Sequence, residues 1–175
     1  IQGNTLQGSY MNNNGIYLSY CDAANIQGNT IKGSGTYSGA GIYLSYCDGA
    51  NVIEDNKINA PDMTKGIYLN YCEATSGSEG KIINNLVNAG DYGIYLNNDN
   101  KYYNVYYNSV RVLNYNAMYS NINPDVIVCK NNIFYTESDG QVALYVSNTT
   151  GFTGDYNDLY SNYTYPVYYN GNKSL

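Results

Sequence analysis

The heptapeptide Gly-Ile-Tyr-Leu-Ser-Tyr-Cys occupies positions 15–21, returns unchanged at 41–47, and returns with one substitution at 66–72. A fourth copy begins at Gly93, and weaker copies begin at Ala117, Ala143 and Pro166. These seven starts lie 23–27 residues apart. Self-similarity at so steady a period indicates a repeat architecture, in which each unit packs on its neighbours.

A second short pattern lies between these copies. It reads apolar-x-x-Asn-x-apolar, as in Ile-Gln-Gly-Asn-Thr-Ile at 26–31 and Ile-Glu-Asp-Asn-Lys-Ile at 53–58. Its asparagines are Asn4, Asn29, Asn56, Asn85, Asn108, Asn132 and Asn157. Both patterns are rich in Ile, Tyr and Asn with alternating apolar residues, which predicts β-strands and not helices. Each repeat thus holds two short β-type runs, joined by Gly, Asn, Asp and Ser.

One repeat is too short to bury its apolar face alone, but stacked repeats bury a continuous one. We therefore predict an all-β fold, a β-solenoid of about seven coils with 23–27 residues per coil. The combined signature resembles the right-handed parallel β-helix repeats of the pectin-lyase-like superfamily, which includes carbohydrate-binding and sugar-hydrolysis domains. This resemblance covers nearly the whole chain and implies a right-handed parallel β-helix. We expect residues 1–175 to be a single domain and a segment of a longer repeat protein.

The composition and charge of the chain exclude some classes of binding partner. The chain has 8 basic and 14 acidic residues, a net charge of −6, one arginine and no histidine. So acidic a chain is a poor candidate for binding nucleic acid, because phosphate backbones need clustered cations. No stretch of 18 apolar residues is present, so we expect no membrane span. The Tyr- and Asn-rich repeats resemble those of large secreted bacterial surface proteins, which implies an exported or cell-surface location.

In a solenoid, a position repeated at the coil period becomes a column of side chains. The seven asparagines of the second pattern form the most complete column. In the family that the chain resembles, such residues turn inward at a bend and hydrogen-bond between coils. Identical buried amides stacked along an axis can satisfy one another's donors and acceptors, so we predict a structural ladder.

Three cysteines form a second column, comprising Cys21, Cys47 and Cys72, and Asp99 follows where the series lapses. Cys129 replaces an inward apolar residue of the second pattern. We predict buried free thiols that behave as small apolar residues. Two alternatives stay open, since neighbouring coils bring Cα atoms within disulfide range and thiols can bind soft metals.

The third column is the candidate ligand-binding surface. It contains Tyr17, Tyr43, Tyr68, Tyr95, Tyr119, Tyr145 and Tyr168, and a shorter column of Tyr20, Tyr46 and Tyr71 lies beside it. Strand alternation sends Tyr outward when the flanking Ile and Leu point inward. One interpretation is purely structural: the stacked rings reinforce the sheet and bind nothing. A long exposed aromatic stripe also marks a binding face, suited to a glycan or to another protein, including copies of this chain.

An acidic column, Asp22, Asp48 and Glu73, follows the cysteines. Solvent can screen these carboxylates, and a weak Ca²⁺ site is the alternative; no other cofactor is expected. A carboxylate pair could also hydrolyse glycosides. The only arginine, Arg111, lies outside the clear repeats, and the His-containing motifs of related hydrolases are absent. We therefore assign no catalytic residue and favour a structural or adhesive segment. A polysaccharide-active domain and an end-to-end fibre subunit are the alternatives.

Overall fold

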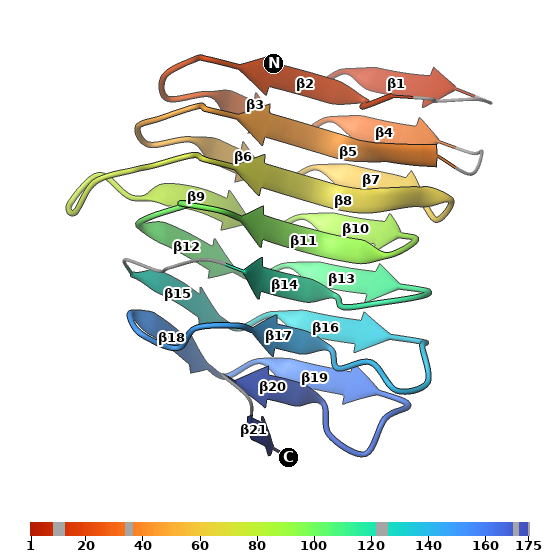
Figure 1. The fold of residues 1–175 in the computed structure, drawn as a ribbon. Coiled ribbons are helices and arrows are strands. Elements are labelled where there is room, and N and C mark those ends of the chain that lie inside the picture. Colours follow the sequence, from red (N-terminus) through yellow and green to blue (C-terminus); the bar gives the residue numbers. More distant parts are fainter. Residues whose placement is uncertain (9–12, 34–36, 122–125, 170–171, 175) are drawn as a thin grey trace.

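The structure, a computed structural model, describes residues 1–8, 13–33, 37–121, 126–169 and 172–174. Its strands form three sheets that run along the molecule (Figure 1). Sheet 1 contains β3 (Asn25–Gln27), β6 (Val52–Glu54), β9 (Gly80–Ile83), β12 (Tyr103–Tyr106), β15 (Ile127–Lys130) and β18 (Phe152–Asp155). Sheet 2 contains β1 (Thr5–Gly8), β4 (Thr30–Gly33), β7 (Lys57–Ala60), β10 (Leu86–Ala89), β13 (Ser109–Val112), β16 (Ile133–Thr136) and β19 (Asp158–Ser161). Sheet 3 contains β2 (Ile16–Ser19), β5 (Tyr37–Ser45), β8 (Met63–Asn70), β11 (Tyr92–Asn97), β14 (Met118–Asn121), β17 (Leu144–Val146), β20 (Val167–Tyr169) and β21 (Asn172–Ser174).

The predicted β-solenoid is confirmed. The chain visits sheets 2, 3 and 1 in turn, and each strand pairs in parallel with its counterparts one coil away, except that β21 pairs antiparallel with β20. The repeat period sets the register, because Ile42 pairs with Ile16 and Ile67, and Tyr43 with Tyr17 and Tyr68. Among the described residues, no helix is long and apolar enough to cross a membrane.

The core fills the space between the three sheets. Within a strand, buried and partly exposed residues alternate, as in β12 and β13. One inward column of sheet 3 is Ile16, Ile42, Ile67, Ile94, Met118, Leu144 and Val167, all of them buried. Cys129 is also buried in the core, as predicted from its place in the second pattern. The apolar column of one coil thus continues into the next, and no unit has to bury its face alone.

The second sequence pattern does not form one run, as the sequence suggested, but two strands on different sheets. The residue before each ladder asparagine has a left-handed backbone, with φ between 52° and 67°. These residues are Gly3, Gly28, Asp55, Asn84, Tyr107, Asn131 and Tyr156. Each one ends a stretch of sheet 1 and turns the chain into sheet 2, so a coil has three strands in place of the two that we predicted.

The asparagine ladder is confirmed. Along the column, each amide oxygen accepts from both the backbone N and the Nδ2 of the preceding ladder residue, at 2.9–3.1 Å. The Nδ2 group also donates to a sheet 1 carbonyl, as from Asn85 to Ile53 at 2.9 Å. The five inner members are buried, whereas Asn4 is exposed and Asn157 half-buried.

Further buried asparagines lie at the other corner, between sheets 3 and 1. The Asn51 Oδ1 accepts from the Ala24 backbone N at 2.8 Å, and the Asn100 Oδ1 accepts from the Cys72 N at 3.0 Å. Neither asparagine was predicted from the sequence, because they do not recur at the coil period. Each satisfies a backbone donor in the loop between sheet 3 and sheet 1, so they hold this turn in place.

Candidate functional site

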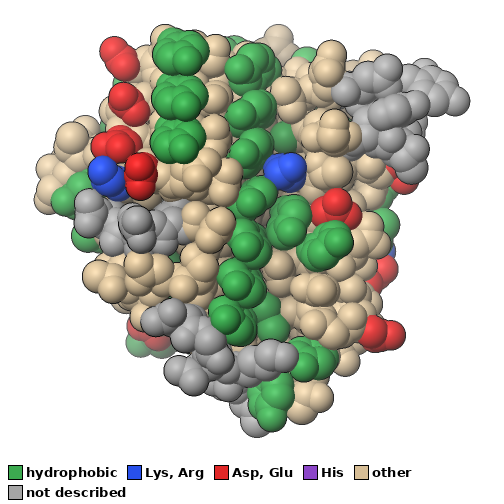
Figure 2. Space-filling model, viewed as in Figure 1, with side chains coloured by type: hydrophobic (Ala, Val, Ile, Leu, Met, Phe, Trp, Pro, Cys, Tyr) green, Lys and Arg blue, Asp and Glu red, His purple; other side chains and the backbone are tan. Residues whose placement is uncertain are grey.

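The outward face of sheet 3 carries the tyrosine ladder, defined as Tyr17, Tyr43, Tyr68, Tyr95, Tyr119, Tyr145 and Tyr168. Consecutive ring centroids lie 4.4–5.2 Å apart. Five of these contacts are stacked, whereas Tyr95 and Tyr119 meet edge to face at 87°. Figure 2 shows a stripe of hydrophobic side chains running along the molecule on this face. The predicted column therefore exists in all seven coils.

The ladder is less exposed than the sequence suggested. Only Tyr17, on the edge strand β2, is more than half exposed, at 53%, and the other six members are partly buried. Stacking explains the difference, because each ring covers one face of the next ring. A partner would therefore meet ring edges and hydroxyl groups along a ridge.

The stacking breaks in the middle of the ladder, where the surface also broadens. The ring of Tyr92 stacks on Tyr95 at 4.8 Å and on Tyr115 at 5.3 Å, and meets Tyr119 edge-on. The ammonium group of Lys65 lies 5.0 Å and 5.6 Å from the ring centroids of Tyr68 and Tyr95. This cluster was not predicted from the sequence. Comparing the residue before each Gly-Ile-Tyr-Leu copy would have found Lys65 and Tyr92 on one face.

Polar groups line the other side of the ladder. The Asn97 Nδ2 donates to the Tyr68 hydroxyl at 3.3 Å and to the Asn70 Oδ1 at 3.2 Å, and the Tyr95 hydroxyl donates to the Asn97 Oδ1 at 3.4 Å. On the side of Lys65, a recess of about 160 Å³ is lined by Tyr43, Tyr68 and Lys65. Aromatic, amide and ammonium groups thus meet within two or three coils, a combination that can bind a polyhydroxylated ligand.

Partial burial changes the titration of the ladder. Burial and the neighbouring phenols raise the pKa of Tyr95 to about 12, and burial also raises the pKa of Tyr68 and Tyr119. Burial lowers the pKa of Lys65 and outweighs the opposite effect of Asp91. Each shift disfavours the charged form, so the phenols of Tyr68, Tyr95 and Tyr119 are neutral near pH 7.

We predict that stability falls between about pH 10 and pH 12. An unfolded tyrosine has a pKa of about 10, whereas the pKa of Tyr95 is about 12 in the folded chain. The folded chain therefore keeps a proton that the unfolded chain releases, so the stabilising effect is full below about pH 10 and is lost as pH rises through this window. Melting temperatures followed by circular dichroism across the window, with tyrosinate absorbance, test this. A melting temperature that stays constant to about pH 12 would contradict it.

The shorter tyrosine column is also present. The rings of Tyr20, Tyr46 and Tyr71 stack at 5.2 Å and 4.9 Å and are nearly parallel. All three residues have a left-handed backbone, with φ of 52–53°. They therefore occupy the bend at which the chain leaves sheet 3, next to the cysteine column.

All four cysteines are free thiols, as predicted. Cys47, Cys72 and Cys129 are buried, but Cys21 is partly exposed, so the prediction of burial is wrong for this residue. The strand that precedes Cys21, β2, lies at the edge of sheet 3, so a neighbouring coil covers the thiol on one side only. Burial raises the pKa of Cys72 to about 12, and burial together with Cys47 raises that of Cys21 to about 11.

The acidic column lies exposed beside the cysteines. The Asp48 Oδ1 accepts from the backbone N of Glu73 at 3.1 Å, and the Glu73 carboxylate pairs with the Lys101 Nζ at 3.2 Å. Within the described ranges, no group of three or more His, Cys, Asp or Glu side chains is placed to hold a metal ion. Calcium binding by Asp22, Asp48 and Glu73 stays a prediction, with Glu73 already paired to a lysine.

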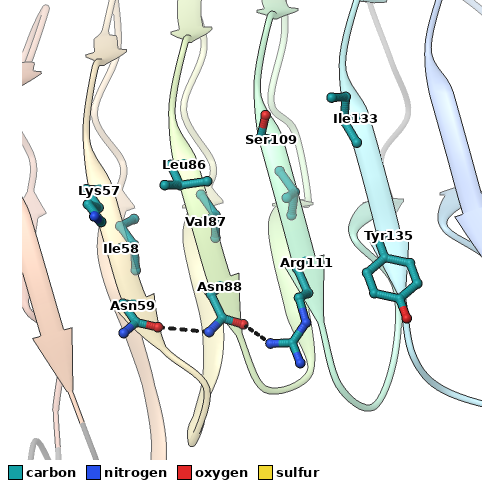
Figure 3. A pocket seen from close by; sticks show the side chains of 11 residues that line it. Lys57, Ile58, Asn59, Leu86, Val87, Asn88, Ser109, Arg111, Ile133 and Tyr135 are labelled. Carbon is teal, nitrogen blue, oxygen red and sulfur yellow. Dashed lines mark hydrogen bonds between the residues drawn. The ribbon is translucent and has the colours of Figure 1, made fainter.

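A second concave surface lies on the outward face of sheet 2, a hollow of about 400 Å³ (Figure 3). Leu86 and Ile133, 50% and 52% exposed, stand on either side of the small Ser109, and the missing bulk at Ser109 creates the hollow. Tyr135 and Arg111 lie farther along the same strands, as Figure 3 shows. This surface was not predicted from the sequence, because its residues do not repeat.

Arg111 belongs to a network beside this hollow. Its Nη1 donates to the Asn88 Oδ1 at 2.8 Å, and its Nη2 pairs with the Glu137 Oε1 at 2.6 Å. The Asn88 Nδ2 in turn donates to the Asn59 Oδ1 at 2.8 Å (Figure 3). The network crosses four coils, so Arg111 connects neighbouring strands of sheet 2.

Comparison with known proteins supports the same architecture. The family model described as a right-handed β-helix region matches residues 1–175. No curated protein and no solved structure matches the chain. The match covers the three-sheet coils and confirms the fold that the repeat signature implied. The chain therefore belongs to the right-handed β-helix family.

Proposed function

We propose that the chain is a non-catalytic structural and adhesive segment of an exported or cell-surface bacterial protein, and that its tyrosine ladder binds a glycan. The family supports a structural or carbohydrate-related domain. The observation that carries the proposal is the ladder itself, seven tyrosines in register along one face of sheet 3. A monomer seldom carries so long an aromatic stripe without a partner for it.

A glycan fits the middle of the ladder best. The rings of Tyr92, Tyr95 and Tyr119 broaden the ridge here, and their edges and hydroxyl groups can pack against a sugar. The amide of Asn97 and the ammonium group of Lys65 lie beside these rings and can bind hydroxyl groups. A protein partner would favour a larger, drier surface with fewer polar groups at its centre.

The test replaces two central ladder residues, Tyr68→Ser and Tyr95→Ser, in one variant. The inward residues of sheet 3 are unchanged, so the variant should fold. Loss of about 1 kcal/mol per ring would weaken glycan binding by tenfold or more. A glycan array identifies the ligand, and titration calorimetry gives the affinities of wild type and variant.

A matched control removes two exposed tyrosines from another part of the surface, by Tyr107→Asn and Tyr156→Asn. Asn84 and Asn131 already occupy the same backbone position in other coils, so this variant should fold and bind like wild type. Equal affinity of wild type and the ladder variant would refute the proposal. If sedimentation shows that wild type and the control self-associate and the ladder variant does not, the partner of the ladder is a second copy of the chain and not a glycan. Glycan cleavage abolished by Asp48→Asn would establish the polysaccharide-active alternative.

A further inference from the structure

Two thiols of the cysteine column are in direct contact. The Sγ atoms of Cys21 and Cys47 lie 2.8 Å apart, although the two residues are 26 positions apart in the chain. The preceding strands β2 and β5 pair in register up to Ser19 and Ser45, which places the cysteines opposite each other in adjacent coils. Neighbouring strands are separated by roughly 4.8 Å, within the Cα separation that a disulfide accepts.

The other thiols have different surroundings. The Cys72 Sγ lies against the carbonyl oxygens of Leu44 and Asn70, at 3.5 Å and 3.6 Å, and the residue is buried. Cys129 is buried beside Met118, with its sulfur 3.5 Å from the Met118 sulfur. Cys21 is the one cysteine that solvent reaches, and its nearest thiol is that of Cys47. Of the four cysteines, Cys21 and Cys47 are therefore the pair whose sulfur atoms are placed to form a disulfide.

We infer that Cys21 and Cys47 are an oxidation site, which a small soluble disulfide converts into an intrachain disulfide that ties two adjacent coils together. The tyrosines that precede them, Tyr20 and Tyr46, already stack at 5.2 Å with almost parallel rings. The cross-link would thus fix a register that the structure has formed, without moving either strand.

The chemistry proceeds by two exchanges. The Cys21 thiol loses its proton and attacks one sulfur of the small disulfide, forming a mixed disulfide and releasing one small thiol. The Cys47 thiol then loses its proton and attacks the Cys21 sulfur, forming the intrachain bond and releasing the second small thiol. Two protein thiols are oxidised, one small disulfide is reduced to two thiols, and the protons pass to the released thiolates.

The test incubates the folded chain with oxidised glutathione at about pH 9, where more of the Cys21 thiol is ionised than at neutral pH, then alkylates the remaining thiols and maps the peptides by mass spectrometry. The inference expects loss of two thiols, a mass lower by two hydrogens, and a peptide pair linking Cys21 to Cys47. A reductant should restore both thiols. The oxidised chain should also melt at a higher temperature than the reduced chain, because the cross-link restricts the unfolded state.

Two variants make the result specific. Cys21→Ser should slow thiol loss by tenfold or more, since it removes the accessible thiol, whereas Cys72→Ala should retain the Cys21–Cys47 link. Four intact thiols in folded wild type after prolonged incubation would overturn the inference. A bond between Cys47 and Cys72, or a Cys21 that stops at the glutathione adduct, would overturn it equally.

Discussion

Replacing Asn85 by Leu is expected to destabilise the chain by about 3 kcal/mol or more. The Asn85 amide accepts from the backbone N and the Nδ2 of Asn56, and donates to Asn108 and to the Ile53 carbonyl. Leucine makes none of these four hydrogen bonds, and the groups left behind are buried. Each buried unsatisfied group costs about 1–3 kcal/mol, offset in part by relaxation.

Equilibrium unfolding in urea measures this loss. Asn59→Leu is the control, since Asn59 is exposed on the outward face of sheet 2 and receives one hydrogen bond from Asn88. We expect the control to change the free energy of unfolding by about 0.5 kcal/mol or less. A loss below about 1 kcal/mol in Asn85→Leu, with the native fold kept, would show that the ladder amides contribute little to stability.

The second large effect is expected at Gly66, which opens the third heptapeptide. A Cβ at this position would lie 2.6 Å from the carbonyl oxygen of Gly93 in the next coil and would overlap a methyl group of Val87. The oxygen belongs to the backbone, so relief requires the coils to separate. Gly66→Ala should therefore cost about 3 kcal/mol, at the upper end of overpacking effects.

Later coils supply the control for this glycine. Ala117 and Ala143 open degraded copies of the heptapeptide and already carry a Cβ. Ala143→Gly should cost only about 1 kcal/mol, through backbone entropy and lost packing. Thermal unfolding of the two variants beside wild type compares them directly. A Gly66→Ala variant as stable as wild type would mean that the spacing between coils adapts more readily than the contact with Gly93 indicates.

Much of this architecture was predictable, because a repeat converts sequence spacing into spatial columns. The asparagine ladder followed from a single residue type at a fixed period, and the inward Ile column followed from alternation within Gly-Ile-Tyr-Leu. The outward direction of the tyrosines came from the same alternation. In each case one residue type occupies the same environment in several coils, so its position and direction could be predicted without knowledge of any contact.

The features that escaped prediction are those that do not repeat or that depend on backbone angles. The bend before each ladder asparagine is occupied by Gly, Asp, Asn or Tyr, so no residue type marks it. Asn51 and Asn100 serve loops of different length, and Lys65 and Tyr92 broaden the ladder in only two coils. The exposure of Cys21 depends on how many coils cover it, which spacing alone does not give.

The central claim is that ligand contacts fall on the tyrosine ladder, and ring-resolved NMR tests it most directly. Chain with isotope-labelled tyrosine rings would be titrated with a glycan that binds. The account predicts shifts at Tyr68 and Tyr95, with no change at Tyr107, which is exposed on a different part of the surface. Shifts at Tyr135 alone would place the ligand in the hollow of sheet 2 and would contradict the claim.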